Sequence, residues 1–128
     1  MADLLAVRGL ERTSAAFRRR LVEVARERKL SADFLAATMS YETGGQFAPG
    51  AYPNGAVGII QWRKDGAASI GRTKAELAKM SAVQQLTEVG EYYAKNAQGK
   101  PVKTLDDHYL VVFAPAAIGK PADASIYV

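Results

Sequence analysis

The sequence has 128 residues, of which 48% are hydrophobic and 23% charged, and its formal net charge is +4. This length suits one globular domain with a buried core, and we expect a single domain over residues 1–128. The chain has no cysteine and its only histidine is His108, which excludes disulfides, thiol catalysis and a multi-histidine zinc site. We therefore expect neither a metal nor a cofactor, and the mild excess of basic residues suits an anionic partner.

The N-terminal segment does not have the pattern of a secretion signal. Its apolar run is interrupted by Asp3, Arg8 and Glu11, and no basic segment precedes it. No stretch of the sequence approaches the roughly 20 consecutive apolar residues of a membrane span. We expect a monomer that is made in the cytoplasm and is not inserted in a membrane.

The first predicted helix covers residues 14–29, with Ser14 as its N-cap. Its apolar residues recur at helical spacing at Phe17, Leu21, Val24 and Ala25. Five arginines lie in the same segment: Arg18, Arg19, Arg20, Arg26 and Arg28. We interpret them as a solvated helix face rather than an anion site, because acidic residues are interspersed with them.

A second helix is predicted to start after Ser31, and its apolar stripe ends in a carboxylate. The stripe follows the spacing i, i+3, i+4, i+7 through Leu35, Thr38, Met39 and Glu42. Gly44 and Gly45 then provide a C-terminal stop. A carboxylate at this end of a helix opposes the helix dipole, and burial disfavours its charge. Both effects raise the pKa of Glu42, as a general acid requires.

The segment from Gln46 to Gly71 is rich in Gly, Pro and Asn, which predicts turns around a short extended piece. Within it, "AVGIIQW" has the composition of a strand or of a buried loop. We expect at most a small hairpin here.

Three further helices are predicted from capping signals. Thr73 with Glu76 and Ser81 with Gln84 form capping boxes, and Thr104 starts a last helix that ends near Pro115. The helix after Ser81 is expected to bury one face, made of Val83, Leu86, Gly90, Tyr93, Ala94 and Ala97. We expect the tail after Pro115 to be loop-like. The fold class is mainly α, or α+β at most.

The stretch "ETGGQFAPGAYPNGAVGIIQW", which begins at Glu42, resembles the active-site region of soluble lytic transglycosylases and goose-type lysozymes. In these families a catalytic Glu ends a helix, and a loop leads to a Gly-hydrophobic-hydrophobic-Gln motif. Here that motif is Gly58-Ile59-Ile60-Gln61, at the family's spacing from Glu42. The resemblance is clear over residues 31–75 and weaker for the last helices and "YLVVFAPAAIGKP".

The resemblance implies a lysozyme-like helical domain with a small glycine-rich hairpin or loop beside the cleft. It implies cleavage of the β-1,4 bond between N-acetylmuramic acid and N-acetylglucosamine in peptidoglycan, with Glu42 as general acid and base. Goose-type enzymes place an Asp at the second position after the motif, where this chain has Arg63. Asp65 is a weaker candidate for a second acid. This pattern favours a lytic transglycosylase, which forms 1,6-anhydro ends, over a hydrolytic lysozyme.

The resemblance also implies substrate-binding roles for residues around the motif. Gln61 binds an N-acetyl group or serves as a structural amide, Trp62 stacks on a sugar or belongs to the core, and Gly58 and Ile60 belong to the motif. Tyr52 stands where bacterial members often have a serine that orients the acid.

The family's late Ala-Tyr-Asn motif is missing, and Phe113 stands near the place of its tyrosine. Tyr109 or Tyr92 are the candidates to replace it. Tyr92 is expected to reach the cleft and Tyr93 to belong to the core. We interpret His108 as a residue on the helix surface.

Two other functions compete with this one at the level of sequence. A catalytically silent glycan-binding relative would not need a buried acid at Glu42. A nucleic-acid binder would need basic residues on one face with aromatic interleaving, which the intervening acids disrupt. We therefore expect a glycan strand as partner and no nucleic acid. Acting on the wall without a signal peptide implies delivery to the periplasm by phage lysis, a virion or a secretion machine.

Overall fold

The computed structural model describes residues 7–115 and 118. In this part the chain is built from helices, and its only β structure consists of isolated bridges, which confirms the mainly α fold class. The elements are η1 Leu10–Arg12, α1 Ala15–Arg28, α2 Ala32–Thr43, α3 Lys64–Ser69, α4 Lys74–Ala78, α5 Ala82–Asn96 and α6 Leu105–Phe113.

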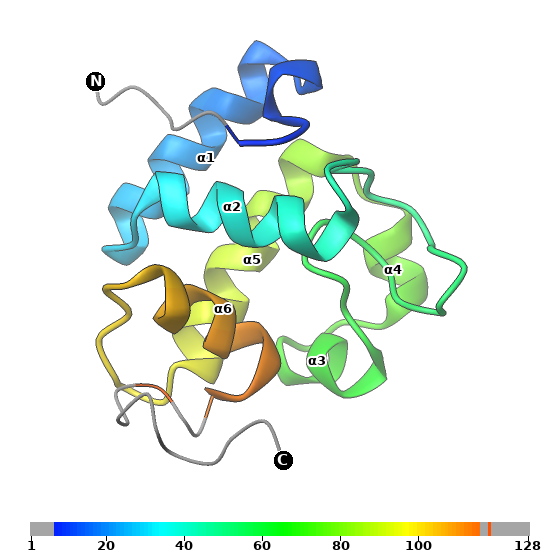
Figure 1. The fold of residues 1–128 in the computed structure, drawn as a ribbon. Helices are drawn as coiled ribbons and strands as arrows, with labels where there is room; N and C mark the ends of the chain where they lie inside the picture. The colour runs from blue at the N-terminus through cyan, green and yellow to red at the C-terminus, as the bar shows by residue number, and fades with distance from the viewer. Residues whose placement is uncertain (1–6, 116–117, 119–128) are drawn as a thin grey trace.

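Helix α5 is the centre of the arrangement (Figure 1). Helix α1 packs along it most extensively, and α3 and α6 also contact it. Helix α2 bridges α1 and α6 and crosses in front of α5 (Figure 1). The loop that follows α2 lies beside α4, at the end of α2 where Glu42 is found (Figure 1).

The predicted helix starts are confirmed. At each of them the N-cap side chain accepts a hydrogen bond from the backbone N–H three residues on, at Ser14, Ser31, Thr73, Ser81 and Thr104. The capping boxes after Thr73 and Ser81 form on both sides, and Thr104 makes a third with Asp107. Such caps supply partners for donors that the first helical turn leaves open.

Helix α1 buries its predicted apolar stripe, but α5 buries more than the one face expected. Ala94 is exposed and Val83 only half-buried, whereas four further residues of α5 are buried: Gln85, Glu88, Val89 and Tyr92. The reason is the central position of α5, because a helix with neighbours on several sides has no single inward face.

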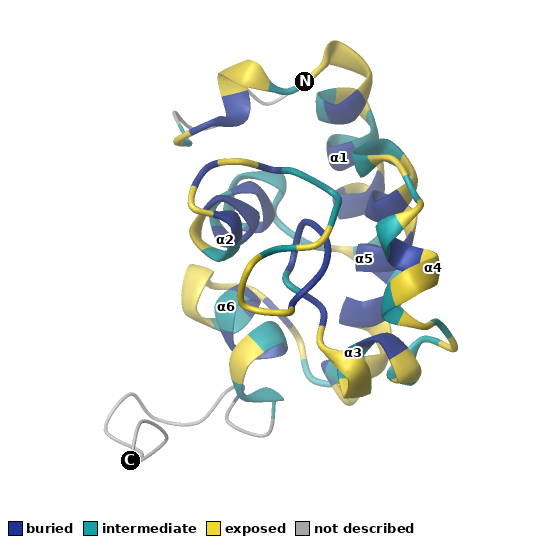
Figure 2. Ribbon diagram, turned by 90° about the vertical axis from the view of Figure 1, so that its right-hand side faces the viewer, coloured by how far each residue is buried: buried dark blue, intermediate teal, exposed yellow. Residues whose placement is uncertain are grey.

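The segment from Gln46 to Arg63 forms turns, as predicted, with antiparallel bridges from Val57 to Ala51 and to Trp62. Figure 2 shows its buried part folded inward beneath an exposed rim. The expectation of turns up to Gly71 was wrong for α3, a helix of six residues that lacks a side-chain cap and contains Gly66. Its contacts with α4 and α5 stabilise it in place of local signals.

No helix in the described part of the chain has the length and apolar character needed to cross a bilayer. Apart from Ile118, the predicted loop-like tail lies outside the described residues, as do the first six residues of the N-terminal segment.

Candidate active site

Glu42 lies in the last turn of α2 and is half-buried. Desolvation raises the pKa of its carboxyl group, as the apolar stripe predicted. The rest of the stripe is fully buried, at Leu35, Thr38 and Met39. Among the described residues, no ion pair or hydrogen bond of the Glu42 side chain is found that would oppose the effect of burial.

The end of α2 is held from two directions. Gly44 is its left-handed C-cap, with φ of 60°, and its N–H donates to the carbonyls of Ser40 and Tyr41. The N-terminal segment braces the same turn: the Ser40 hydroxyl donates to the carbonyl of Arg8 (2.6 Å), and Arg12 donates to the carbonyl of Gly45 (3.1 Å). These contacts fix where the chain leaves the helix, and with it the position of Glu42.

The charge of Glu42 acts on two tyrosines of α5. Burial raises the pKa of Tyr92, and the charge of Glu42 raises it further. Burial also raises the pKa of Tyr93, a hydrogen bond with Thr38 opposes this, and Glu42 again adds to the increase. The Tyr93 hydroxyl donates to the carbonyl of His108 (3.0 Å). Tyr93 belongs to the core, as expected, and Tyr92 is also buried, with a small part of its surface exposed.

The predicted motif forms a tight turn in the loop after α2, and Gly58 is essential to its geometry. Gly58 has φ of 87°, and a Cβ atom there would lie 2.6 Å from Trp62 Cε3 and 2.9 Å from Gln85 Oε1. Only glycine fits both the backbone conformation and the space. The backbone at Gly58 thus lies close to buried side chains of the protein interior.

Gln85 of α5 organises the loop, a role that the sequence did not indicate. Its side chain is fully buried; Oε1 accepts from the N–H of Ile59 (3.0 Å), and Nε2 donates to the carbonyls of Pro49 and Leu77 (2.8 Å each). One side chain thus satisfies three backbone groups, two in the loop and one in α4. No local signal could have indicated this, since none of the three partners belongs to the helical turn around Gln85.

The remaining polar residues of the motif are engaged within the loop. Gln61 has φ of 60°, its Nε2 donates to the carbonyl of Gly58 (3.1 Å), and its Oε1 accepts from Asn54 (3.2 Å). These contacts support the structural interpretation of the Gln61 amide. The Tyr52 hydroxyl donates to the carbonyl of Ala48 (2.9 Å), and desolvation raises its pKa.

Trp62 and Ile60 have their side chains in the core, so burial supports the core interpretation of Trp62 over sugar stacking. The indole Nε1 of Trp62 is buried without a hydrogen-bond partner among the described residues. Asp65 lies on the exposed first turn of α3.

The interpretation of His108 as a surface residue was wrong, because its side chain is 0% exposed. Its Nε2 accepts from the N–H of Ser31 (3.2 Å), and its Nδ1 lies 2.7 Å from the carbonyl of Thr104. This pattern fits a neutral ring protonated at Nδ1. Burial lowers the pKa of His108, while Thr104 and Asp107 oppose that change. The ring joins α6 to the start of α2, where it also meets Phe34 (5.6 Å between centroids).

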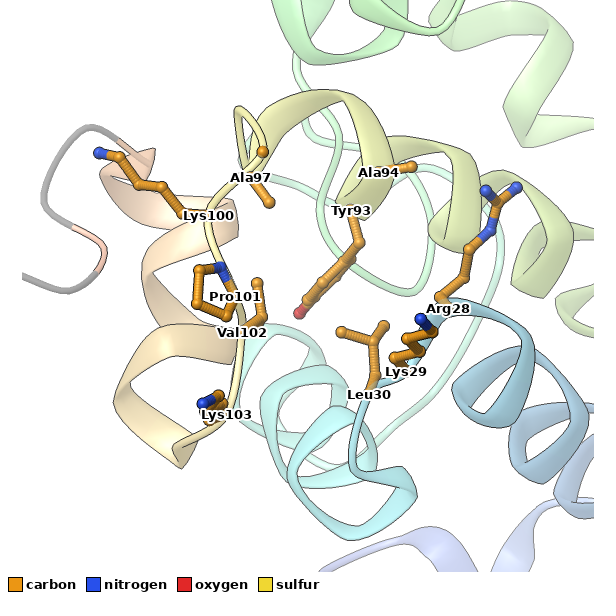
Figure 3. A pocket seen from close by; sticks show the side chains of 11 residues that line it. Arg28, Lys29, Leu30, Tyr93, Ala94, Ala97, Lys100, Pro101, Val102 and Lys103 are labelled. Atoms are coloured by element: carbon orange, nitrogen blue, oxygen red, sulfur yellow. The ribbon is translucent and has the colours of Figure 1, made fainter.

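Two hollows flank the helices near the site. One, of about 460 Å³, lies between α2 and α6 and is lined by Ala37, Thr38, Tyr41, Leu105, Asp106 and Tyr109. The other, of about 440 Å³, lies between the ends of α1 and α5 and the segment from Gly99 to Lys103. Figure 3 shows Tyr93 pointing into it toward Leu30 and Val102, with Arg28 and Lys29 at one side. Glu42 lines neither hollow.

Within residues 7–115, no group of three acidic or histidine side chains is arranged to hold a metal ion. No protein-family model, no curated protein and no solved structure matches this chain.

Proposed function

We propose that this protein cleaves the β-1,4 bond between N-acetylmuramic acid and N-acetylglucosamine in peptidoglycan, as a lytic transglycosylase with Glu42 as general acid and base. The observation that carries the proposal is the environment of Glu42: a half-buried carboxyl group with a raised pKa, at a braced helix end, whose charge acts on Tyr92 and Tyr93. A general acid needs these properties in order to hold a proton near neutral pH.

In the proposed reaction the protonated Glu42 donates its proton to the glycosidic oxygen, and the bond from that oxygen to the muramoyl anomeric carbon breaks. The muramoyl 6-hydroxyl then attacks the anomeric carbon, and the Glu42 carboxylate accepts the hydroxyl proton. The products are a 1,6-anhydro end and a free 4-hydroxyl. This route needs one carboxylate, which agrees with Arg63 standing where goose-type enzymes place an Asp and with the exposed position of Asp65.

The loop from Gly44 to Arg63 has a positioning role in this proposal. Gln85 and Gly58 hold its buried part against α5, so that the backbone of the motif stays in one place relative to Glu42. Precise placement of the reacting groups supplies much of the rate enhancement of enzymes. Delivery to the wall by phage lysis, a virion or a secretion machine is part of the same proposal.

Clearing of Gram-negative cells with a permeabilised outer membrane tests the role of Glu42. We expect wild-type protein to lower the turbidity and Glu42→Gln to clear at least ~100-fold more slowly, the usual effect of losing a general acid. Glu23→Gln is the matched control, since it makes the same chemical change on the exposed face of α1. Equal clearing by wild type and Glu42→Gln would remove Glu42 from the mechanism. No clearing by wild type would favour the silent glycan-binding relative.

A further inference from the structure

The large hydrophobic side chains that are exposed in the described part of the chain all lie on one surface. They are Tyr41 (69% exposed), Leu105 (44%) and Phe113 (53%). Tyr41 belongs to α2 and the other two to α6. We call the surface formed by these residues and Tyr109 the aromatic face. Exposed apolar surface gathered in one place marks an interaction site more often than scattered residues do.

The rings of the aromatic face form a connected row across the two helices. Tyr41 meets Tyr109 with centroids 5.2 Å apart and planes at 83°, and Tyr109 stacks on Phe113 at 5.5 Å and 21°. The row therefore has fixed ring orientations while Tyr41 and Phe113 still expose more than half of their surface. Preformed aromatic surface binds a flat apolar partner with little loss of side-chain freedom.

Beside this row lies the hollow between α2 and α6, whose volume of about 460 Å³ is in the range of small-ligand sites. Its polar side chains among the described residues are Thr38, Asp106 and the two tyrosines, and none of the described lining residues is a lysine or arginine. Aromatic rings next to a carboxylate suit a sugar, because a pyranose has an apolar C–H face and hydroxyl donors at its edge. The hollow at the ends of α1 and α5 differs, since Arg28, Lys29, Lys100 and Lys103 line it. An anionic ligand would therefore fit the hollow at the ends of α1 and α5 better than it would fit the aromatic face.

The aromatic face includes the residue next to Glu42 in the sequence of α2. Tyr41 directly precedes Glu42, and Thr38 lies one helical turn before it on the same stripe. Thr38 lines the hollow, although little of its side chain is exposed. The neighbouring positions of Tyr41 and Glu42 on α2 place the aromatic face within reach of a polymer bound at Glu42.

We propose that the aromatic face is a glycan subsite that binds β-1,4-linked N-acetylhexosamine units beyond the bond cleaved at Glu42. Tyr41 supplies the leading stacking surface, Phe113 extends it, and Asp106 accepts hydrogen bonds from sugar hydroxyls. The identity of the glycan rests on the proposed function.

Binding of a soluble hexamer of β-1,4-linked N-acetylglucosamine tests the subsite, with calorimetry on the full chain carrying Glu42→Gln so that no cleavage occurs. We expect saturable binding that Tyr41→Ala and Phe113→Ala each weaken by about 3- to 10-fold. Tyr41→Phe is the matched control, because it keeps the ring, and it should bind within about twofold of the parent. Since Tyr41 and Phe113 are exposed, these changes should leave the fold intact, and circular dichroism of each variant checks this directly.

Absence of binding, or equal affinity of the parent and both alanine variants, would overturn the subsite. A change in the sedimentation coefficient of the protein on Tyr41→Ala, without a change in its affinity for the hexamer, would also overturn the subsite. The aromatic face would then join two copies of the chain. The proposed function fails separately: binding that depends on Tyr41, in a protein whose wild type clears no cells, supports the subsite and contradicts cleavage. Clearing that depends on Glu42 but not on Tyr41 or Phe113 contradicts the subsite alone.

Discussion

Two regions contribute to the core: the pair of helices α1 and α2, and the loop from Gly44 to Arg63. Different interactions determine the structure of each region. Each helix is defined within a few residues of itself, by a serine cap and a buried stripe. The loop uses left-handed backbone at Gly58 and Gln61 and depends on hydrogen bonds to Gln85, far away in sequence. Glu42 stands where the two regions meet. The position of the acid therefore depends on both, and the loop should be the more sensitive of the two to single changes.

The largest expected effect is that of Gly58→Ala. A Cβ atom at Gly58 combines an unfavourable φ with contacts of 2.6 Å to the Trp62 ring and 2.9 Å to Gln85, so we expect a loss of about 3–4 kcal/mol in the free energy of unfolding. Gly55→Ala is the matched control, since Gly55 has the same φ of 87° but nothing within 4 Å of where its Cβ atom would lie, and it should lose only about 1 kcal/mol. Urea unfolding followed by fluorescence measures both. Similar losses for the two variants would contradict the packing role of Gly58.

A smaller loss is expected for Gln85→Ala. The change leaves the N–H of Ile59 and the carbonyls of Pro49 and Leu77 without their partner in a buried setting, which costs about 3 kcal/mol in total. Its neighbour Gln84 is exposed and serves only the capping box, so Gln84→Ala should cost about 1 kcal/mol or less. If the two variants unfold at the same urea concentration, Gln85 does not hold the loop.

The smallest expected effect is the pH dependence of stability that His108 causes where it joins α6 to α2. Because burial lowers the pKa of His108 in the folded protein, the unfolded chain binds a proton more readily. The contribution of neutral His108 is complete above the unfolded pKa of about 6.5 and is lost as pH falls from there through the folded pKa. Protonation removes the acceptor for the N–H of Ser31, and the loss of this hydrogen bond costs about 1 kcal/mol.

Thermal unfolding between about pH 7.5 and about pH 5, a range chosen around the ordinary histidine pKa of about 6.5, measures this effect. Wild type should lose stability over that range, and His108→Gln should lose less. Since His108 is the only histidine, no other side chain of that type contributes. Parallel curves for the two proteins would show that the ring is not linked to folding.

The same contrast explains what could be predicted from the sequence. The starts of α1, α2, α4, α5 and α6 were predictable because an N-cap and its partner are three residues apart. Helix α3 was not, since it has no side-chain cap and exists through tertiary contacts. The burial of His108 was not predictable either, because its partner Ser31 is 77 residues away.

Within the candidate site, the position of Glu42 on the apolar stripe was enough to predict the direction of its pKa shift. The loop motif singled out Gly58, and its positive φ shows why a glycine stands there. What the motif could not indicate was that Gly58 packs against the interior, or that Gln85 is its neighbour. Those facts depend on how α5 lies against the loop, which no local pattern encodes.

Mass spectrometry of the soluble products from purified peptidoglycan decides whether Glu42 cleaves the glycan strand as proposed. We expect wild-type protein to release fragments with 1,6-anhydro ends and Glu42→Gln to release none above the level without protein. Reducing ends from the wild type would indicate hydrolysis in place of the transglycosylase route. Equal release by wild type and Glu42→Gln would contradict the claim.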